Sequence, residues 1–340
     1  MLIDQFAFRL TGSTTACRTY VFSTILPDSL LTIILYGVFW LTFPKLSTLY
    51  PIQFSWKNLK HMAALVMLSS YLTNRTQSIS TPAGSSPPLP ITRSIIQGSG
   101  IGPTSFIAYI ADLQPLCSIN IYSKYADDLT ILNPASSPVS LSDEFNHVQQ
   151  WADSNQMKIN IMKTKEIVFH RSNARRSDIP TQIDINIQQV DCVKLLGIFF
   201  SDNLSFCPHV NALITALNQR FYLLGQLRRQ GLDMHGLQTV FKSIILSKIL
   251  YACQSFSGFL STTDIDRLQS CLNKAHKWGF TKSPIKLPQL FDQYNSNLFK
   301  QITTNSLHCL HQLLPPKRDM HGRSLRRRGH QYELPLIKFE

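Results

Sequence analysis

The first third of the sequence has almost no acidic residues. Asp4 and Asp28 are the only ones before Asp112, and residues 29–111 contain neither aspartate nor glutamate. Soluble domains carry charged side chains at about a quarter of their positions, so this stretch is unusual in composition. It also lacks clear helix caps and sustained periodicity, and a Pro/Gly/Ser-rich loop follows at residues 80–90. The sequence becomes regular only from residue 91 onward.

Paired cysteine motifs are absent as well. The seven cysteines are scattered along the chain, and none forms a C-x-x-C pair. Neither a disulfide framework nor a zinc site is therefore indicated, and we expect a reducing compartment. The N-terminal residues lack the basic segment and apolar core of a secretory signal. Together these absences predict an intracellular protein, in the cytoplasm and nucleus.

The sequence also lacks an apolar run long enough to span a membrane. Residues 30–43 are apolar, but they fall short of the roughly 20 residues that a membrane helix needs. We interpret them as a buried strand or helix, or as a segment without a sound fold, and membrane association is not expected. A membrane-associated protein anchored through these residues is the least favoured alternative.

Basic residues are abundant. The 33 lysines and arginines against 20 acids give a formal net charge of +13, which favours a polyanionic partner such as nucleic acid or an anionic membrane surface. The hydrophobic content of 44% in 340 residues is ample for one large domain or two smaller ones. A cluster of arginines near the C-terminus, Arg323, Arg326, Arg327 and Arg328, is interpreted as a disordered basic tail in preference to a defined binding site.

From residue 91 the patterns predict a mixed α+β architecture. Start signals and apolar spacing indicate helices, and Val/Ile/Phe-rich runs indicate strands. The expected helices cover residues 104–113, 140–155, 208–229, 233–252 and 263–279, and the expected strands cover residues 165–170 and 193–201.

Two adjacent aspartates, Asp127 and Asp128, occur in the segment YADDLTI. Strand-like runs on both sides place them at or next to a hairpin turn. A charged turn is the commoner explanation for an isolated Asp-Asp pair. Adjacent carboxylates at a tight turn also suit Mg²⁺, a small ion that takes oxygen ligands. A glycine-rich loop that opens a helix lies upstream, at residues 97–104; alone it is a weak signal of phosphate binding.

The order of these segments resembles a known family. QGSGIGPTSF, then YADD, NIMKTKEIVF and VKLLGIFFS resemble the palm of a reverse transcriptase, of the kind found in jockey-like non-LTR retrotransposons. The resemblance covers most of residues 71–336 and the first sixteen residues. It implies an RNA-directed DNA polymerase with a right-hand palm, an antiparallel sheet with packed helices, followed by a helical thumb-like region. Its partners would be an RNA template, a DNA primer and dNTPs, with Mg²⁺ or Mn²⁺ as cofactor and no stable protein partner.

The resemblance also implies a division of the chain into four segments. These are a degenerate fingers and early-palm region, partly disordered or irregular, at residues 1–90; the palm at 91–204; the thumb-like region at 205–282; and a C-terminal extension with a basic tail at 283–340.

Residue roles follow from the same resemblance. Asp127 would be the direct metal ligand in a two-metal site, and Asp128 would bind metal more peripherally. Lys163 is a candidate for assisting pyrophosphate departure, although a solvated turn lysine explains it about equally well. The remaining assignments are nucleotide and template contacts by Gln97, Gly98, Tyr125 and Ala126, a primer grip at Leu196 and Gly197, and nucleic-acid backbone contacts by Arg220, Arg228, Arg229, Arg326, Arg327 and Arg328.

Alternatives stay open for several of these residues. A buried hairpin explains Leu196 and Gly197 nearly as well as a primer grip. A solvated helix face is the preferred explanation for Arg220, Arg228 and Arg229 unless their surface proves contiguous.

One part of the family pattern is missing. The two-metal mechanism needs a further aspartate from an earlier strand, and in the nearest match, LTFPKL, Thr42 stands at that position. We see no resemblance across residues 17–70, which suggests a reading-frame disturbance or a wrongly joined segment in the encoding DNA. We therefore expect severely impaired catalysis, with a non-catalytic nucleic-acid-binding remnant as the alternative. No carboxylate from the N-terminal third is expected near the aspartate pair, and Asp112 is expected to have a structural role.

Overall fold

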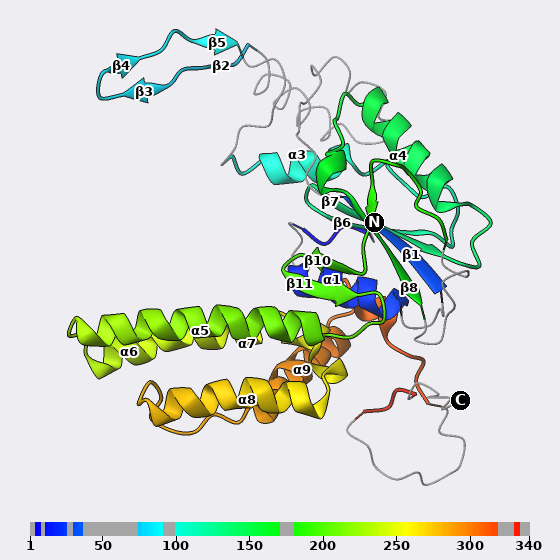
Figure 1. The fold of residues 1–340 in the computed structure, drawn as a ribbon. Coiled ribbons are helices and arrows are strands. Elements are labelled where there is room, and N and C mark those ends of the chain that lie inside the picture. Colours follow the sequence, from blue (N-terminus) through cyan, green and yellow to red (C-terminus); the bar gives the residue numbers. More distant parts are fainter. Residues whose placement is uncertain are drawn as a thin grey trace.

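The structure of the chain is a computed structural model that describes residues 4–7, 11–25, 30–36, 74–90, 99–170, 180–318 and 330–333. A twisted sheet occupies the centre of the molecule (Figure 1). Helices α3 (Gly102–Tyr109) and α4 (Leu141–Ser154) lie above it in this view, and the long C-terminal helices lie below it. The described part of the chain is thus a mixed arrangement of helices and small sheets, which confirms the expected α+β class.

The central sheet has five strands in the order β6-β7-β1-β8-β9. The neighbours are antiparallel except for β8 and β9. The strands are β1 (Leu30–Tyr36), β6 (Ile121–Tyr125), β7 (Asp128–Pro134), β8 (Lys165–His170) and β9 (Gln188–Gln189).

Strand β1 comes from the acid-free stretch and lies between β7 and β8. The strand interpretation is therefore confirmed for residues 30–36; residues 37–43 lie outside the described residues. No helix in the described ranges is long and apolar enough to cross a membrane.

Helix α4 forms as its sequence predicts. The side chain of Ser140 accepts a hydrogen bond from the backbone N–H of Asp143, which caps the first turn. Phe145, Val148 and Ala152 then fall on one buried face. Helix α3 ends at Tyr109, four residues before the predicted end of that helix.

The C-terminal half is helical. It contains α5 (Cys207–Arg229), α6 (Met234–Phe241), α7 (Ser247–Leu250), α8 (Thr262–Lys277) and α9 (Leu287–Thr304), with a π-helical segment at Lys242–Leu246 between α6 and α7. The helices predicted at residues 208–229, 233–252 and 263–279 are confirmed, while α9 was not predicted. Its signals were present in the sequence, since Pro288 stands in the first turn and Leu287, Phe291 and Ile302 supply a buried face.

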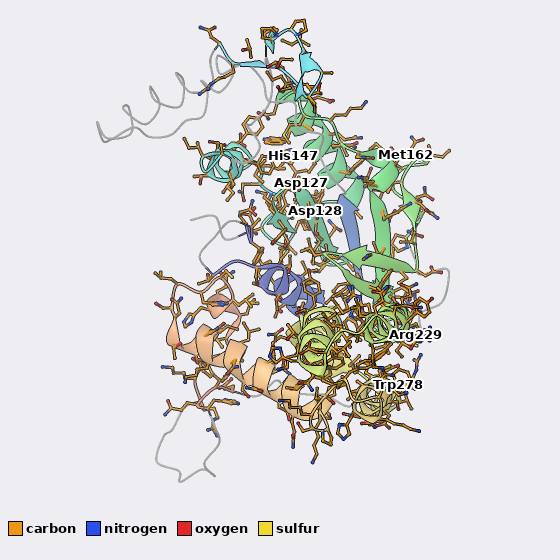
Figure 2. The ribbon with its side chains drawn as sticks, turned by 90° about the vertical axis from the view of Figure 1, so that its left-hand side faces the viewer. Asp127, Asp128, His147, Met162, Arg229 and Trp278 are labelled. Carbon is orange, nitrogen blue, oxygen red and sulfur yellow. The ribbon has the colours of Figure 1, made fainter. Side chains whose placement is uncertain are left out.

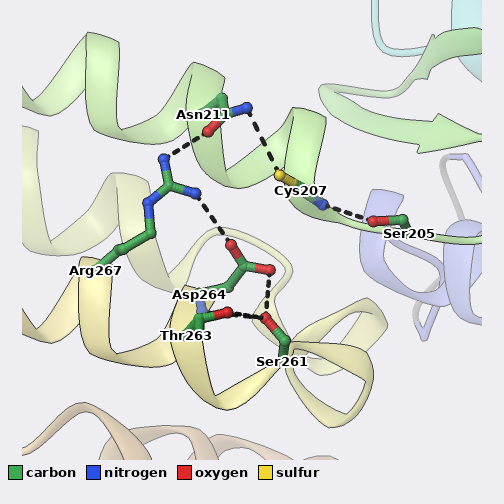
Figure 3. Close-up of polar contacts among 7 residues, drawn as sticks. All are labelled: Ser205, Cys207, Asn211, Ser261, Thr263, Asp264 and Arg267. Carbon is green, nitrogen blue, oxygen red and sulfur yellow. Dashed lines mark hydrogen bonds and ion pairs between the residues drawn. The ribbon is translucent and has the colours of Figure 1, made fainter.

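A polar network joins the N-terminal ends of α5 and α8 (Figure 3). Arg267 Nη2 donates to Asn211 Oδ1 at 2.6 Å, and Arg267 Nη1 lies 3.1 Å from Asp264 Oδ1. Ser261 caps α8 by accepting from the Asp264 N–H, and its hydroxyl donates to Asp264 Oδ2. The two helices therefore share polar as well as apolar contacts.

A two-stranded hairpin, β10 (Cys192–Leu195) and β11 (Ile198–Ser201), links the sheet to the helices. A large apolar core runs through this junction and contains residues from β7, β8, β10, β11 and helices α5 to α9. A separate exposed ribbon projects from the top of the molecule in Figure 1 and consists of β2 (Thr76–Gln77), β3 (Ser80–Thr81), β4 (Gly84–Ser85) and β5 (Leu89–Pro90).

Candidate active site

The aspartate pair lies at a tight hairpin turn, as predicted. Tyr125 at the end of β6 pairs with Asp128 at the start of β7, so Ala126 and Asp127 form the turn. Ala126 has φ 55°, a left-handed conformation that residues with a Cβ rarely adopt. All four residues are half-buried. Figure 2 shows Asp127 and Asp128 side by side next to the sheet.

An apolar pocket borders the turn. Asp127 and Asp128 are among its lining residues, together with residues from and around helices α3 and α4, which include Phe106, Ile110, Leu113, Trp151 and Met157. The indole N–H of Trp151 donates to Asp112 Oδ1 at 3.2 Å. This hydrogen bond is consistent with the structural role that we expected for Asp112.

A buried lysine lies directly before the turn. Lys124 is 2% exposed, and its Nζ lies 2.5 Å from Asp4 Oδ2. It also donates to the carbonyl oxygens of Ile110 and Leu113. Burial lowers the pKa of Lys124, and the Asp4 charge opposes that shift. Sequence reasoning missed this residue, although a lysine within a strand whose neighbours are apolar or small was a visible signal.

The strand beside Asp128 contributes no carboxylate. Strand β1 pairs with β7 up to Tyr36, which lies opposite Leu129, the residue after Asp128. None of residues 29–111 is acidic. Within the described ranges, no group of three or more His, Cys, Asp or Glu side chains could hold a metal ion. Thr42 lies outside the described residues.

A second turn lies near the first one. Leu196 and Gly197 connect β10 and β11. Both Tyr125 and Leu196 pack against one apolar cluster, which contains Phe6, Ala16, Cys17, Ile302, Cys309 and Leu310. The pKa of Tyr125 is raised by burial, with smaller contributions from Tyr251 and Asp128. The structure therefore brings together two of the predicted groups, the hairpin at 125–128 and the turn at 196–197.

The structure does not bring the other predicted residues to these two turns. Lys163 is exposed at the end of the short 3-10 helix Ile161–Lys163, before β8. Gln97, Gly98 and the basic cluster Arg326, Arg327 and Arg328 lie outside the described residues.

Three arginines of the predicted thumb-like region were expected to contact nucleic acid, and two of them form contacts within the protein. Arg220 Nη1 donates to the carbonyl oxygen of Ile244. Arg228 Nη1 donates to the Trp278 carbonyl at 2.8 Å, and its guanidinium lies 5.3 Å from the centre of the Phe280 ring. Arg229 is exposed. Figure 2 places Arg229 and Trp278 well away from Asp127 and Asp128.

Part of the sequence matches a known protein family. Residues 51–200 match the family "Reverse transcriptase (RNA-dependent DNA polymerase)". The match enters the stretch at residues 17–70 in which we saw no resemblance, so that prediction is wrong for residues 51–70.

Curated relatives agree with the family. The RNA-directed DNA polymerase from mobile element jockey of Drosophila melanogaster is 24% identical over 220 residues, 60% of this chain and 24% of the relative. The probable RNA-directed DNA polymerase from transposon BS of the same species is 23% identical over 223 residues, 62% of this chain and 24% of the relative. The chain thus spans about a quarter of the length of the curated relatives it matches.

Among solved structures, the chain is similar to a telomerase from Candida tropicalis in complex with a fragment of telomeric RNA. It is 11% identical, with a TM-score of 0.41, over 87% of this chain and 53% of that one.

Proposed function

Because the chain contains a reverse transcriptase domain of a non-LTR retrotransposon family, we propose that it binds an RNA template paired with a DNA primer but transfers nucleotides poorly. In this proposal the central sheet with α3 and α4 is the palm, within residues 91–204 together with β1. Helices α5 to α8, within residues 205–282, are the thumb. Residues 1–90 correspond to a degenerate fingers and early-palm region, and residues 283–340 to a C-terminal extension.

Poor catalysis is supported chiefly by strand β1. A polymerase site of this kind holds two divalent cations between three carboxylates on neighbouring strands. Asp127 and Asp128 supply two of them, while β1, the sheet neighbour of β7, has no acidic residue. No carboxylate elsewhere in residues 29–111 can substitute, because that stretch contains none.

The expected size of the defect follows from the lost charge. A unit charge about 4 Å from a cation is worth about 4 kcal/mol at an effective dielectric near 20. Loss of that much transition-state stabilisation lowers a rate about 10³-fold. The residual donors, Asp127 and Asp128, fit at most one weakly held Mg²⁺ or Mn²⁺, and we assign no reaction step to it.

Nucleic-acid binding is supported by the charge distribution. The chain carries a net charge of +13. Within the described ranges only three ion pairs form, Lys124–Asp4, His170–Asp202 and Arg267–Asp264. Most of the described cations therefore have no carboxylate partner and contribute to a positive field that attracts phosphates.

Two measurements on the full chain test the proposal. The first is binding of a fluorescent RNA–DNA duplex, expected to weaken steeply as salt rises. The second is primer extension on an RNA template with Mg²⁺ or Mn²⁺, with Asp127→Asn as the comparison. We expect measurable binding and extension no faster than that of the variant.

Each contrary outcome has a distinct meaning. Absence of duplex binding would refute the proposed function as a whole. Robust extension that Asp127→Asn abolishes would show that the missing carboxylate is dispensable, and robust extension that survives Asp127→Asn would refute the assignment of the site.

A further inference from the structure

The turn between β10 and β11 has an unfavourable backbone conformation. Leu196 has φ 46°, and Gly197 has φ 95°. A left-handed conformation is unfavourable for an L-residue, so the surrounding structure must hold Leu196 in place. The side chain of Tyr251 closes over Gly197, because a Cβ built there would lie 3.1 Å from Tyr251 Cε1.

Two side chains from distant parts of the sequence hold this turn by one atom, the carbonyl oxygen of Leu196. Arg18 Nη1, from helix α1 (Thr14–Ile25), donates to it at 2.6 Å. The Tyr251 hydroxyl donates to it at 3.1 Å. The Arg18 guanidinium also lies 4.8 Å from the centre of the Tyr251 ring, a stacking arrangement that suits a planar cation.

Arg18 is a buried cation without a carboxylate partner in the described ranges. Its exposed fraction is 0%. Its Nε donates to the carbonyl of Thr14, one turn earlier in α1, and its Nη2 has no hydrogen-bond partner among the described residues. Burial lowers the pKa of Arg18, with the interaction with Tyr251 opposing the shift. A buried charge without a carboxylate partner is costly, so the contacts with the two carbonyls and with Tyr251 must hold the guanidinium in place.

We propose that Arg18 and Tyr251 form a clamp that positions the Leu196–Gly197 turn beside Tyr125 for contact with an RNA–DNA duplex. Arg18 is a positioning residue, since it acts through the carbonyl of Leu196. This inference rests on the proposed function for its ligand, while the clamp itself rests on the contacts above.

The clamp also links the two turns of the candidate site. Tyr125 and Leu196 pack against the same apolar cluster. Tyr251, Arg18 and Asp128 all contribute to the pKa of Tyr125. Helix α1 therefore lies where it can fix the spacing between the aspartate hairpin and the β10–β11 turn. A duplex that contacts both turns would require that spacing.

The experiment uses the full chain with Tyr251→Phe and Arg18→Lys. Tyr251→Phe keeps the ring and removes the hydroxyl, with its 3.1 Å bond to the Leu196 carbonyl and its longer 3.4 Å bond to Thr14 Oγ1. Arg18→Lys keeps the charge but cannot donate to Thr14 and Leu196 while lying flat on the ring. Tyr222→Phe, at an exposed tyrosine of α5, is the matched control. The readouts are hydrogen exchange of peptides covering β10–β11 and α4, and affinity for the RNA–DNA duplex.

We expect Tyr251→Phe to accelerate exchange in β10–β11 about tenfold, which corresponds to the loss of one hydrogen bond, with α4 and the control unchanged. Duplex affinity should fall about threefold or more, since the turn loses its fixed geometry. Arg18→Lys should show both changes as well, because lysine cannot reproduce the directed hydrogen bonds of the guanidinium.

Equal acceleration in α4 and β10–β11 would overturn the clamp, because it would indicate global destabilisation. Faster local exchange with unchanged duplex affinity would overturn the positioning role. If the unmodified chain binds no duplex, the proposed function fails, and the exchange comparison still decides whether the clamp exists.

Discussion

The two turns of the candidate site are supported by buried cations of different kinds. Next to the β6–β7 turn, Lys124 is paired with the Asp4 carboxylate at 2.5 Å. At the β10–β11 turn, Arg18 donates to carbonyl oxygens and lies against Tyr251, with no carboxylate partner among the described residues. Both turns contain a non-glycine residue at positive φ, Ala126 and Leu196. One turn is thus supported by an ion pair beneath it, and the other by direct hydrogen bonds to its backbone.

The comparison shows what the N-terminal segment contributes. Asp4 and Arg18 both come from the first eighteen residues, and the carbonyl and N–H groups of residues 4 and 6 bond to the backbone of Lys124. The segment therefore supports both turns. Removing it should damage both turns at once.

The largest effect is expected from breaking the ion pair. Lys124→Met leaves the Asp4 carboxylate, which is 16% exposed, without its cation. Removing one partner of a buried pair typically costs about 3–5 kcal/mol, measurable by urea unfolding. The double variant Asp4→Asn, Lys124→Met should recover part of that loss, because neither charge is then left alone. Lys158→Met, at an exposed lysine, is the control. A loss below about 1 kcal/mol would show that the pair contributes little.

The second effect concerns protonation beside Arg18. His209 is 3% exposed and packs edge-on against Phe256. Burial, with smaller contributions from the charges of Lys248, Arg18 and Lys194, lowers the pKa of His209 to about 4. The unfolded chain, with a pKa near 6.5, binds the proton more readily, so stability should fall as pH falls from about 6.5 to about 4.

The expected loss from His209 over that window is about 3 kcal/mol, at 1.36 kcal/mol for each unit of pKa difference. Urea unfolding at a series of pH values measures it. His209→Leu should flatten the slope in this window, and His235→Gln, at an exposed histidine, should leave it unchanged. An identical slope in His209→Leu and the unmodified chain would contradict the assignment.

The third effect tests how closely the β10–β11 turn is fitted. Gly197→Ala adds a Cβ at φ 95°, 3.1 Å from the Tyr251 ring. Backbone strain and the close contact together should cost about 2 kcal/mol. The control is Gly225→Ala within α5, where a Cβ meets nothing within 4 Å, and there alanine should stabilise by about 0.5–1 kcal/mol. Thermal unfolding of both variants checks the opposite signs.

The range of the contacts explains which parts of the fold could be predicted from the sequence. The hairpin at Asp127 and Asp128, helix α4 and the first three C-terminal helical stretches follow from local patterns, which do not depend on the rest of the chain. The pairing of β1 with β7, Asp4 with Lys124 and Arg18 with Leu196 joins residues far apart in the sequence. Such contacts leave no periodic signal, so sequence reasoning could not find them. The roles of Asp127, Lys163 and the other site residues stay predictions.

The smallest effect is expected at the β6–β7 turn itself. Ala126→Gly relieves a left-handed residue at φ 55°, worth about 1–2 kcal/mol, but it adds the backbone entropy of glycine, about 0.5–1 kcal/mol. The net stabilisation should be about 0.5 kcal/mol, visible in thermal unfolding. Ala108→Gly inside α3 is the control and should destabilise by about 1 kcal/mol. Leu196→Gly should not stabilise, because the Leu196 side chain packs against two apolar clusters. A clear gain from Leu196→Gly would mean that the two turns bear their strain in the same way.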